Sequence, residues 1–571
     1  MGAPLSTAWS RRPAEPILRI PPFPGATSSS LSRALPRTAI SAIDESDLRA
    51  YVTALGEARV GGAFWGAQPH IGNADPVIAR PSSLVQVREM LAYAAEAGLA
   101  DQVLWWLPSQ AATAALPDAP AISPIYGDCD PWYLFSHASA IWLDSADENV
   151  LLAQIAGISV LSFEEGGSRT VLGEKDVLQR AREQLAGMSY SDPFTGEPSD
   201  ILSAIALLKY WRGVIDYNRP IVGAAGFAYW KKAAVAPLLW GGAEPVRFMA
   251  ANKAALDLVD KSGALAIWKS RVPKPFLHEV EQRGGNLFEV EDGFIRSAGL
   301  GADCVPPLSI VVDKIGVHFD PAQPSELENL LQFGEFSPAI LERAERLRRL
   351  IIETGVSKYG TGGEAMDRPG GKRRHVLVTG QVEDDRSVLS GGGDVAGNLD
   401  LLRRARAQEP DSYIIYKPHP DVEAGHRKGL VPKDQALSYA DSVVPDAPIS
   451  SLLDMVDGVH VLTSLAGFEA LIRGKQVTTH GVPFYAGWGL TTDLGYIPAR
   501  RTARRDVIEI VAAVLLLYPR YLDPVTSLPC PPEVLVKRLV AGIGKENWAI
   551  VSLRRLQGSA RQKLSKMGIT I

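Results

Sequence analysis

Two short apolar runs in the second half of the chain are each followed by side chains that suit a phosphate-bearing ligand. The run at 414–416 leads to Lys417 and His419, and a later run leads to Thr463 and Ser464. Continuous apolar runs of this length are typical of buried parallel strands, and open α/β sheets bind ligands at the carboxyl ends of their strands. A lysine, a histidine and two hydroxyls on one sheet edge therefore predict a site for a nucleotide phosphate.

These residues also have ordinary structural explanations. A single histidine is most often part of the packing, and Thr463-Ser464 before a helix would make a good N-cap. The prolines on both sides of His419 fix the backbone at the strand end, and Lys417 lies two residues away on the same face. This arrangement favours a functional histidine, whereas the Thr-Ser pair stays open between the two explanations.

Acidic side chains follow another apolar run, at 376–378. Glu383, Asp384 and Asp385 are contiguous there, with Gln381 just before them. Such a loop is solvated, or holds a metal ion, or presents a carboxylate to a sugar carbon as a nucleophile. The residue types alone do not choose among these three.

A second pair of carboxylates, Glu291 and Asp292, ends a strand-like run at 288–290. Paired carboxylates at a strand end suit proton transfer. Arg296 would hold one of them ionised or bind an acidic sugar. A salt bridge at the domain surface explains the same residues equally well.

The stretch PFYAGWG at 483–489 is rich in aromatic residues and glycine. Tyr485 and Trp488 could stack on a base or a sugar, or could form a tight packing corner. The chain contains no G-x-x-x-x-G-K-[ST], no H-E-x-x-H and no cysteine cluster. Their absence disfavours P-loop ATPases and zinc hydrolases.

Strands and helices alternate in two regions that resemble each other, which indicates an internal duplication. AFWGAQ ending at Gln68 pairs with VLVTGQ ending at Gln381, and DPFTGEP at 192–198 pairs with DPVTSLP at 523–529. The helix-ending Gly157 likewise corresponds to Gly474. The first copy has WWLP where the second has KPHP, so we expect it to keep its packing without its chemistry.

Composition places the chain among soluble globular proteins, and the length prior suggests about three to four domains. A net charge of -5 gives no reason to expect nucleic acid as a partner, and three scattered cysteines fit a reducing cytoplasm. The apolar run at 511–518 is far shorter than a membrane span. A basic face at 552–567 could touch an anionic membrane surface, or could simply be solvated.

Several long motifs resemble the bacterial capsule polysaccharide β-Kdo transferases of the KpsC type, over roughly 264–526 and in family order. The motifs are DGFIRSAGLG at 292–301, PPLSIVVD at 306–313, GQVEDDRS at 380–387, YKPHPDV at 416–422, GFEALIRG at 467–474 and PFYAGWGLT at 483–491. The resemblance implies an α/β fold with a GT-B-like pair of Rossmann-like domains around a cleft, preceded by a degenerate Rossmann-like domain.

The resemblance also implies roles for individual residues. Asp385 becomes the nucleophile, and Glu291 or Asp292 the acid/base. The predicted donor-binding residues are Gln381, Lys417, His419, Pro420, Thr463, Ser464, Gly467 and Glu469. The predicted substrate-binding residues are Arg296, Ser297, Lys358, Tyr485 and Trp488.

The expected function is a retaining β-Kdo transfer from CMP-Kdo to a phosphatidylglycerol-linked oligo-Kdo acceptor in capsule polysaccharide biosynthesis. No metal ion or other cofactor is implied. Because only the second copy has the full motif set, we expect one active site and a companion Kdo transferase. We expect a cytoplasmic protein, peripheral at the inner face of the membrane. The alternatives are a transferase for another nucleotide sugar, or a non-catalytic capsule assembly or export factor.

These patterns together predict seven segments. They are a disordered tail (1–40), a degenerate Rossmann-like module remnant (41–200), a helical linker (201–242), an acceptor-side Rossmann-like half (243–358), a hinge (359–373), a CMP-sugar-binding half (374–522) and C-terminal helices with a basic end (523–571).

Overall fold

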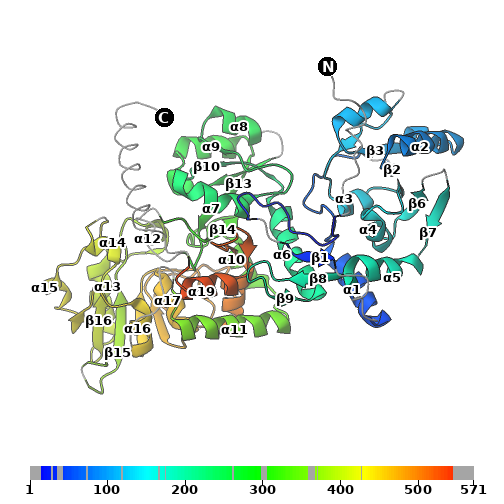
Figure 1. Cartoon of the computed structure of the whole chain (residues 1–571). Coiled ribbons are helices and arrows are strands. Elements are labelled where there is room, and N and C mark those ends of the chain that lie inside the picture. Colours follow the sequence, from blue (N-terminus) through cyan, green and yellow to red (C-terminus); the bar gives the residue numbers. More distant parts are fainter. Residues whose placement is uncertain are drawn as a thin grey trace. The chain divides into compact units, whose positions relative to one another are not determined.

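The chain forms two compact units, Met1–Arg219 with Leu239–Pro245, and Pro220–Leu238 with Val246–Ile571 (Figure 1). We call them the first and the second unit. The computed structural model describes residues 15–27, 30–34, 43–72, 75–116, 120–164, 168–173, 175–259, 263–296, 305–357, 367–369, 371–425 and 427–543.

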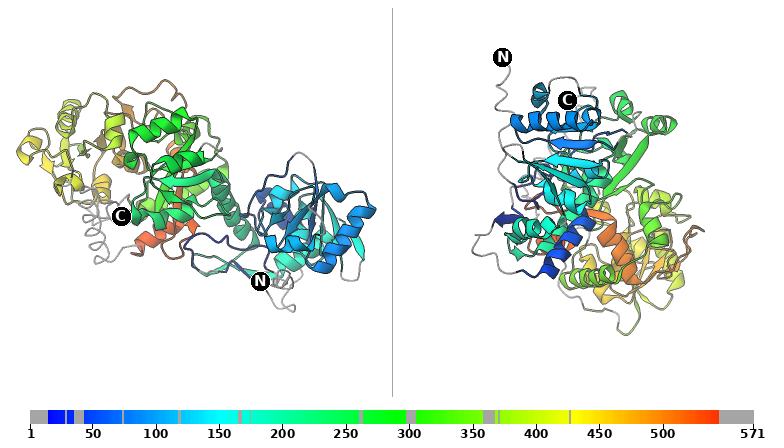
Figure 2. Two further views of the ribbon diagram at one scale, coloured as in Figure 1. Left: turned by 90° about the horizontal axis from the view of Figure 1, so that it is seen from above. Right: turned by 90° about the vertical axis from the view of Figure 1, so that its right-hand side faces the viewer.

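The first unit contains a six-stranded sheet of order β4-β3-β2-β5-β6-β7, parallel except for β7. Its strands are β2 (Val77–Arg80), β3 (Val103–Leu107), β4 (Ile125–Tyr126), β5 (Ala140–Leu143), β6 (Ser159–Phe163) and β7 (Arg169–Leu172). Its helices are α2 (Leu84–Glu96), α3 (Pro131–Phe135) and α4 (Asn149–Ile155). The strands run outward in both directions from β2 and β5, so right-handed crossovers place α2 and α4 on opposite faces (Figure 2).

A smaller three-stranded sheet completes this unit, with β1 (Ser32–Ala34) pairing β8 (Met188–Ser191) and β8 pairing β9 (Pro198–Ser199). Around it lie α1 (Glu45–Ala58), α5 (Lys175–Ala181), a π-helix at Arg182–Ala186 and α6 (Ile201–Asn218). Asp200 caps α6 by accepting a hydrogen bond from the Ser203 amide at 2.8 Å. The long α6 thus begins directly after the hairpin formed by β8 and β9.

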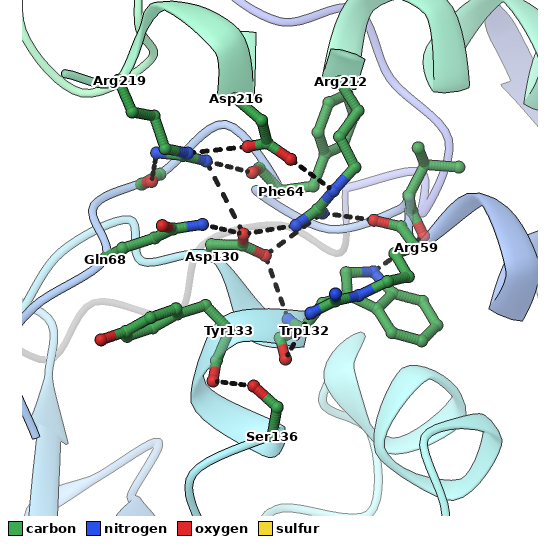
Figure 3. A network of polar contacts seen from close by, with 12 residues as sticks. Arg59, Phe64, Gln68, Asp130, Trp132, Tyr133, Ser136, Arg212, Asp216 and Arg219 are labelled. Atoms are coloured by element: carbon green, nitrogen blue, oxygen red, sulfur yellow. Dashed lines mark hydrogen bonds and ion pairs between the residues drawn. The ribbon is translucent and has the colours of Figure 1, made fainter. Parts of the chain in front are cut away.

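A buried ion-pair network attaches α6 to the rest of the first unit (Figure 3). Asp130, just before α3, is fully buried and accepts hydrogen bonds from Arg212 Nη2 at 2.7 Å and from Gln68 Nε2 at 2.9 Å. Arg219 approaches the same carboxylate at 3.6 Å, and Asp216 balances the second positive charge. Each of these side chains binds another member of the network, so the cluster stabilises the contact between α6 and the rest of the first unit.

Replacing Asp130 by alanine is expected to lower the free energy of unfolding of the first unit by about 3–5 kcal/mol, because two arginines lose their buried counter-charge. The urea unfolding transition of the first unit measures this change in free energy. The matched control is Asp101→Ala, at an exposed aspartate before β3. A loss below about 1 kcal/mol, as expected of a surface ion pair, would show that the network is dispensable.

The second unit begins with a seven-stranded sheet of order β11-β10-β12-β13-β14-β21-β22. Its strands are β10 (Ile221–Ala225), β11 (Phe248–Met249), β12 (Ala264–Ile267), β13 (Asn286–Asp292), β14 (Ser309–Asp313), β21 (Pro519–Leu522) and β22 (Pro529–Cys530). Strands β10 to β13 are parallel, so their carboxyl ends meet at one edge. The helices of this half are α7 (Tyr229–Leu239), α8 (Lys253–Val259), α9 (Lys274–Gln282), α10 (Glu326–Phe333) and α11 (Pro338–Thr354).

The other half of the second unit has a six-stranded parallel sheet of order β17-β16-β15-β18-β19-β20. Its strands are β15 (His375–Thr379), β16 (Tyr413–Lys417), β17 (Ser442–Val443), β18 (Gly458–Val461), β19 (Gln476–Thr479) and β20 (Thr492–Asp493). Its helices are α12 (Arg386–Gly391), α13 (Asn398–Gln408), α14 (Pro420–Glu423), α15 (Lys433–Ala436), α16 (Ile449–Met455) and α17 (Leu465–Ile472). After it come α18 (Val507–Val511), a π-helix at Ala512–Leu517 and α19 (Pro532–Val540).

The two six-stranded sheets have the same strand order, which supports the predicted duplication. Gly157 and Gly474 both end a helix in the left-handed conformation, at φ 77° and 72°. In each copy a π-helix is followed by a hairpin in equivalent register, Tyr190 opposite Ser199 and Tyr521 opposite Cys530. The fold is therefore α/β, with a Rossmann-like first unit and two Rossmann-like halves in the second.

Buried contacts join the two halves of the second unit. The Phe294 ring lies 4.9 Å from the Phe484 ring, and the His318 ring lies 5.7 Å from it. Glu328 on α10 accepts a 2.8 Å hydrogen bond from Arg501, and both side chains are buried. Strands β21 and β22 return from the second half into the sheet of the first, which further fixes the two halves together.

The structure corrects three of the expectations. Residues 15–27 and 30–34 are not disordered, since Phe23 packs against Trp211 and β1 pairs with β8. The helical linker at 201–242 is wrong in part, because β10 lies within it and belongs to the second unit. The pairing of AFWGAQ with VLVTGQ is wrong, since AFWGAQ at 63–68 lies outside every sheet and β2 takes the place that corresponds to β15. Its apolar residues pack in a loop instead.

Candidate active site

Gln381 joins the loops after β15 and β18, at the carboxyl edge of the six-stranded sheet of the second unit. The Gln381 amide Nε2 donates to Thr463 Oγ1 at 3.0 Å, and its Oε1 accepts from the Thr463 backbone amide at 2.8 Å. The Gln381 backbone amide donates to Asn398 at 2.9 Å. Two residues predicted to bind the donor are thereby brought together, with Gln381 as the support of Thr463.

Asp385 stands at the N-cap of α12 and its side chain is exposed. Its Oδ2 accepts a 2.7 Å hydrogen bond from the Ser387 hydroxyl, which lies 3.5 Å from the Thr463 hydroxyl. Asp385 is thus connected through Ser387 to the Gln381–Thr463 pair. One oxygen is oriented by the helix start, while the carboxylate remains accessible.

Glu291 lies at the end of β13, in the other half of the second unit. It accepts a 2.8 Å hydrogen bond from Arg386 Nη1, and Arg386 is the residue that follows Asp385. Arg386 also approaches Glu289 on the same strand face at 3.7 Å. Burial raises the pKa of Glu291 to about 7, outweighing the attraction of Arg386, and the neighbouring charge of Asp292 raises it further. A carboxyl group with such a pKa can accept and release a proton near neutrality.

Asp292 is held by two cations. Arg296 Nε donates to Asp292 Oδ2 at 2.8 Å, and Lys231 Nζ, on α7, lies 3.2 Å from Oδ1. Arg296 is buried and also donates to the Val305 carbonyl at 2.9 Å. Of the two roles expected for Arg296, the structure shows the ion pair with Asp292, and the buried guanidinium is not exposed to bind an acidic sugar.

Lys417 and His419 follow β16 as predicted. Lys417 Nζ donates to the Pro445 carbonyl at 2.9 Å, and burial lowers the pKa of this lysine. His419 is half-buried and caps α14, with Nδ1 accepting from the Asp421 amide at 3.1 Å. In the neutral ring the proton is then on Nε2. Pro420 occupies the first position of α14 and is exposed.

Ser464 caps α17, its hydroxyl accepting from the Ala466 amide at 3.2 Å. Gly467, in the first turn, packs so closely on Tyr485 that a Cβ there would lie 2.2 Å from the phenol oxygen. Glu469 is largely buried one turn further on. This part of the predicted donor site is therefore at the start of α17, although only Ser464 has a partly exposed side chain.

Tyr485 and Trp488 form the packing corner that was one of the two interpretations of their motif. Both side chains are fully buried. The Tyr485 hydroxyl donates to the Ser464 carbonyl, and Trp488 Nε1 donates to the Phe484 carbonyl at 2.8 Å. Their assignment as substrate-binding residues is wrong, because neither ring is exposed to a substrate.

Two predicted residues, Ser297 and Lys358, lie outside the described residues, as does most of the expected hinge. The other acids of the Asp385 loop have partners: Asp384 pairs with Arg427 at 3.0 Å, and Glu383 accepts from the Asn398 amide at 2.9 Å. Within the described ranges, no group of three or more His, Cys, Asp or Glu side chains is placed to hold a metal ion. No helix among the described residues combines the length and apolar character needed to cross a bilayer.

Lys231 is the member of the site that the sequence patterns missed. Its pair with Lys232 was interpreted as part of a helical linker. The available signal was its position directly after a strand-like run, at the start of a helix, where the carboxyl end of β10 joins those of β12 and β13.

Residues 264–521 match the family model for capsule polysaccharide biosynthesis proteins. The capsule polysaccharide modification protein LipA of Neisseria meningitidis serogroup A is 38% identical over 353 residues, 62% of this chain and 50% of LipA. The lipopolysaccharide-processing protein LpsZ of Rhizobium meliloti is 46% identical over 239 residues, 41% of this chain and 54% of LpsZ. The chain spans about half the length of these curated relatives.

Two solved chains of Thermosulfurimonas dismutans KpsC also match, each over 56% of this chain. The β-Kdo 2,4 transferase is 30% identical with 98% of its length covered and a TM-score of 0.48. The β-Kdo 2,7 transferase is 34% identical with 99% covered and a TM-score of 0.46. By the family model and the curated relatives, residues 264–521 belong to the family of capsule polysaccharide biosynthesis proteins.

Proposed function

We propose that the chain is a retaining β-Kdo glycosyltransferase that moves Kdo from CMP-Kdo onto a lipid-linked oligo-Kdo acceptor. One observation carries the proposal: Arg386 binds Glu291 at 2.8 Å while its neighbour Asp385 presents an exposed carboxylate. Arg386 thus ties the loop that carries the candidate nucleophile to the strand that carries the candidate acid/base, in the other half of the unit. A retaining transfer needs these two groups at one site.

In the first step a carboxylate oxygen of Asp385 attacks the anomeric carbon of Kdo, and the bond from that carbon to the CMP phosphate breaks. The electron pair leaves with CMP. In the second step an acceptor hydroxyl attacks the same carbon, its proton passes to Glu291, and Asp385 leaves as a carboxylate. Two inversions restore the configuration of the donor. The pKa of Glu291, near 7, suits it to take the proton.

The donor phosphate is assigned to the edge formed by the loops after β16 and β18. His419 Nε2 is a donor in the neutral ring because Nδ1 is occupied by the Asp421 amide. Lys417 adds positive charge on the same strand end, and Ser464 offers a partly exposed hydroxyl at the start of α17. A cation and neutral donors of this kind suit a nucleoside monophosphate, with no metal ion required.

The acceptor and the partners are proposed from the family. KpsC provides one chain described as a 2,4 transferase and another as a 2,7 transferase. The present chain has one intact set of motifs, so a companion Kdo transferase would supply the second linkage. A phosphatidylglycerol-linked acceptor would place the reaction at the inner face of the cytoplasmic membrane. The basic stretch at 552–567, which lies outside the described residues, is the candidate for membrane contact.

Replacing His419 by alanine is expected to weaken CMP binding by about 1–3 kcal/mol, the value of a hydrogen bond to a charged group. Isothermal titration of CMP measures the loss. The matched control is His278→Ala, at an exposed histidine on α9 that contacts Gln282, and it should leave the dissociation constant unchanged. An unaltered dissociation constant for the His419 variant would remove this residue from the donor site.

Donor hydrolysis distinguishes Kdo transfer from the two alternatives, a transferase for another nucleotide sugar and a non-catalytic assembly factor. The wild-type protein incubated without acceptor should release CMP from CMP-Kdo and leave CMP-sialic acid and UDP-sugars intact. Turnover of one of the other donors would change the substrate assignment. Failure with every donor, together with an unchanged capsule in cells carrying Asp385→Ala, would favour a non-catalytic assembly factor.

A further inference from the structure

Lys231 occupies a buried position where three strands of the second unit end. It lies in the first turn of α7, after β10, with its Nζ 3.2 Å from the centre of the Trp268 ring that follows β12. The Trp230 ring lies 5.2 Å from the same ammonium group. Its third neighbour is Asp292, the last residue of β13, with Oδ1 at 3.2 Å. A lysine with only 7% of its surface exposed must draw its stability from these partners.

The charges facing Lys231 come from several elements. Asp292 and Glu291 on β13 attract it, and Arg296 in the following loop repels it. Burial is the largest effect and lowers the pKa of Lys231 to about 8. Glu291 in turn faces Arg386 from α12 and its strand neighbours Glu289 and Asp292. Lys231 is therefore the buried cation on the α7 side of a carboxylate pair whose other side faces Arg386.

Asp292 and Glu291 are adjacent in the strand, so their side chains leave on opposite faces of the sheet. Asp292 is fixed by Lys231 and Arg296, whereas Glu291 meets Arg386 beside the proposed nucleophile. Without Lys231, Asp292 would lose one of the two cations described beside it, so its negative charge would oppose the ionised form of Glu291 with less compensation. The position and the charge of Glu291 thus depend on Lys231, which lies on α7.

We infer that Lys231 is a positioning residue of the proposed transfer reaction: its ammonium group fixes Asp292 and favours the ionised, proton-accepting form of Glu291. This inference rests on the proposed function for its kinetic consequence, but its electrostatic content does not depend on which sugar is transferred. In the proposed reaction Lys231 touches neither donor nor acceptor. It acts through Asp292 and Glu291.

The sign of the effect follows from the charges. A nearby cation favours a carboxylate and lowers its pKa, so removing the cation raises the pKa of Glu291. A base that must be ionised works only above its pKa, so the acidic limb of the pH profile moves to higher pH. Arginine also carries a positive charge throughout the pH range of the acidic limb. The arginine variant should therefore keep this limb where the wild type has it.

The test compares wild type, Lys231→Met, Lys231→Arg and the control Lys232→Met, whose lysine lies on the same helix and is half-buried near Phe248. The pH dependence of kcat/KM is measured with CMP-Kdo and a short Kdo acceptor, and CMP binding checks the fold. In parallel, the Glu291 carboxyl is titrated by NMR in protein with ¹³C-labelled glutamate side chains, with Glu291→Gln for assignment. The NMR titration needs no turnover.

Lys231→Met should raise both the kinetic limb and the Glu291 titration by roughly one pH unit. The acidic limb of Lys231→Arg should match that of the wild type. Lys232→Met should change neither the acidic limb nor the Glu291 titration. A Glu291 titration that does not move in Lys231→Met overturns the inference, whatever the activity. If wild type transfers no Kdo but the titration moves as stated, the proposed function fails and the role of Lys231 stands.

Discussion

Asparagine at position 385 is expected to abolish Kdo transfer while leaving the fold and CMP binding in place. The asparagine side chain can still cap α12 and accept the hydrogen bond from Ser387, so the local structure does not depend on the charge. The amide cannot form the glycosyl ester, and the loss of a nucleophile lowers kcat on the order of 10⁴- to 10⁶-fold. Initial rates with CMP-Kdo and a short Kdo acceptor measure the effect.

The matched control is Asp384→Asn, at the neighbouring carboxylate. Asp384 pairs with Arg427 at 3.0 Å on the surface, and exposed ion pairs of this kind contribute about 0–1 kcal/mol. Its transfer rate should stay within about fivefold of wild type, because about 1 kcal/mol corresponds to a factor of roughly five. Mass spectrometry of wild type given CMP-Kdo alone should detect a Kdo adduct on a peptide containing Asp385. Wild-type turnover in Asp385→Asn would exclude this residue as the nucleophile.

Glutamine at position 291 should lower kcat by about 10²- to 10⁴-fold, the usual contribution of a general base. The glutamine carbonyl can still accept from Arg386, so the link between the two halves is kept. The acidic limb of the pH profile, expected near the Glu291 pKa of about 7, should disappear, because the residual activity no longer depends on this group. Below that pH, wild-type Glu291 holds a proton and cannot take another.

Glu281→Gln, at an exposed position on α9, serves as the control and should leave the profile unchanged. A Glu291→Gln enzyme that keeps both its rate and its acidic limb would transfer the acid/base role elsewhere. Asp292 is the next candidate in sequence. Its two cationic partners at 2.8 and 3.2 Å favour its ionised form, however, so it is poorly suited to carry a proton at neutral pH.

The sequence was sufficient to bring the predicted donor-binding residues to one sheet edge, because that placement depends on local patterns. Continuous apolar runs are typical of buried parallel strands, and the polar residues after β15, β16 and β18 then had to meet at one edge. Gln381 and Thr463 bind each other there, although 82 residues separate them. The duplication was visible for a related reason, since helix-ending glycines and the hairpin turn impose their own residue types.

The remaining features depend on contacts that no local pattern encodes. Lys231 and Asp292 are 61 residues apart, and Arg386 and Glu291 are 95 apart, so spacing does not reveal either pair. Tyr485 and Trp488 were ambiguous because aromatic, glycine-rich segments suit both pockets and packing corners, and only burial decides. AFWGAQ was wrongly paired with VLVTGQ because an apolar run of that length suits a packed loop as well as a strand.

The anomeric configuration of the product tests the double displacement at Asp385 most directly. Wild-type protein is incubated with CMP-Kdo and a short synthetic Kdo acceptor, and the purified product is analysed by NMR. We expect an acceptor extended by Kdo, with the same anomeric configuration as in the donor. A product of inverted configuration would contradict the double displacement at Asp385, and an acceptor left unextended would contradict the transferase itself.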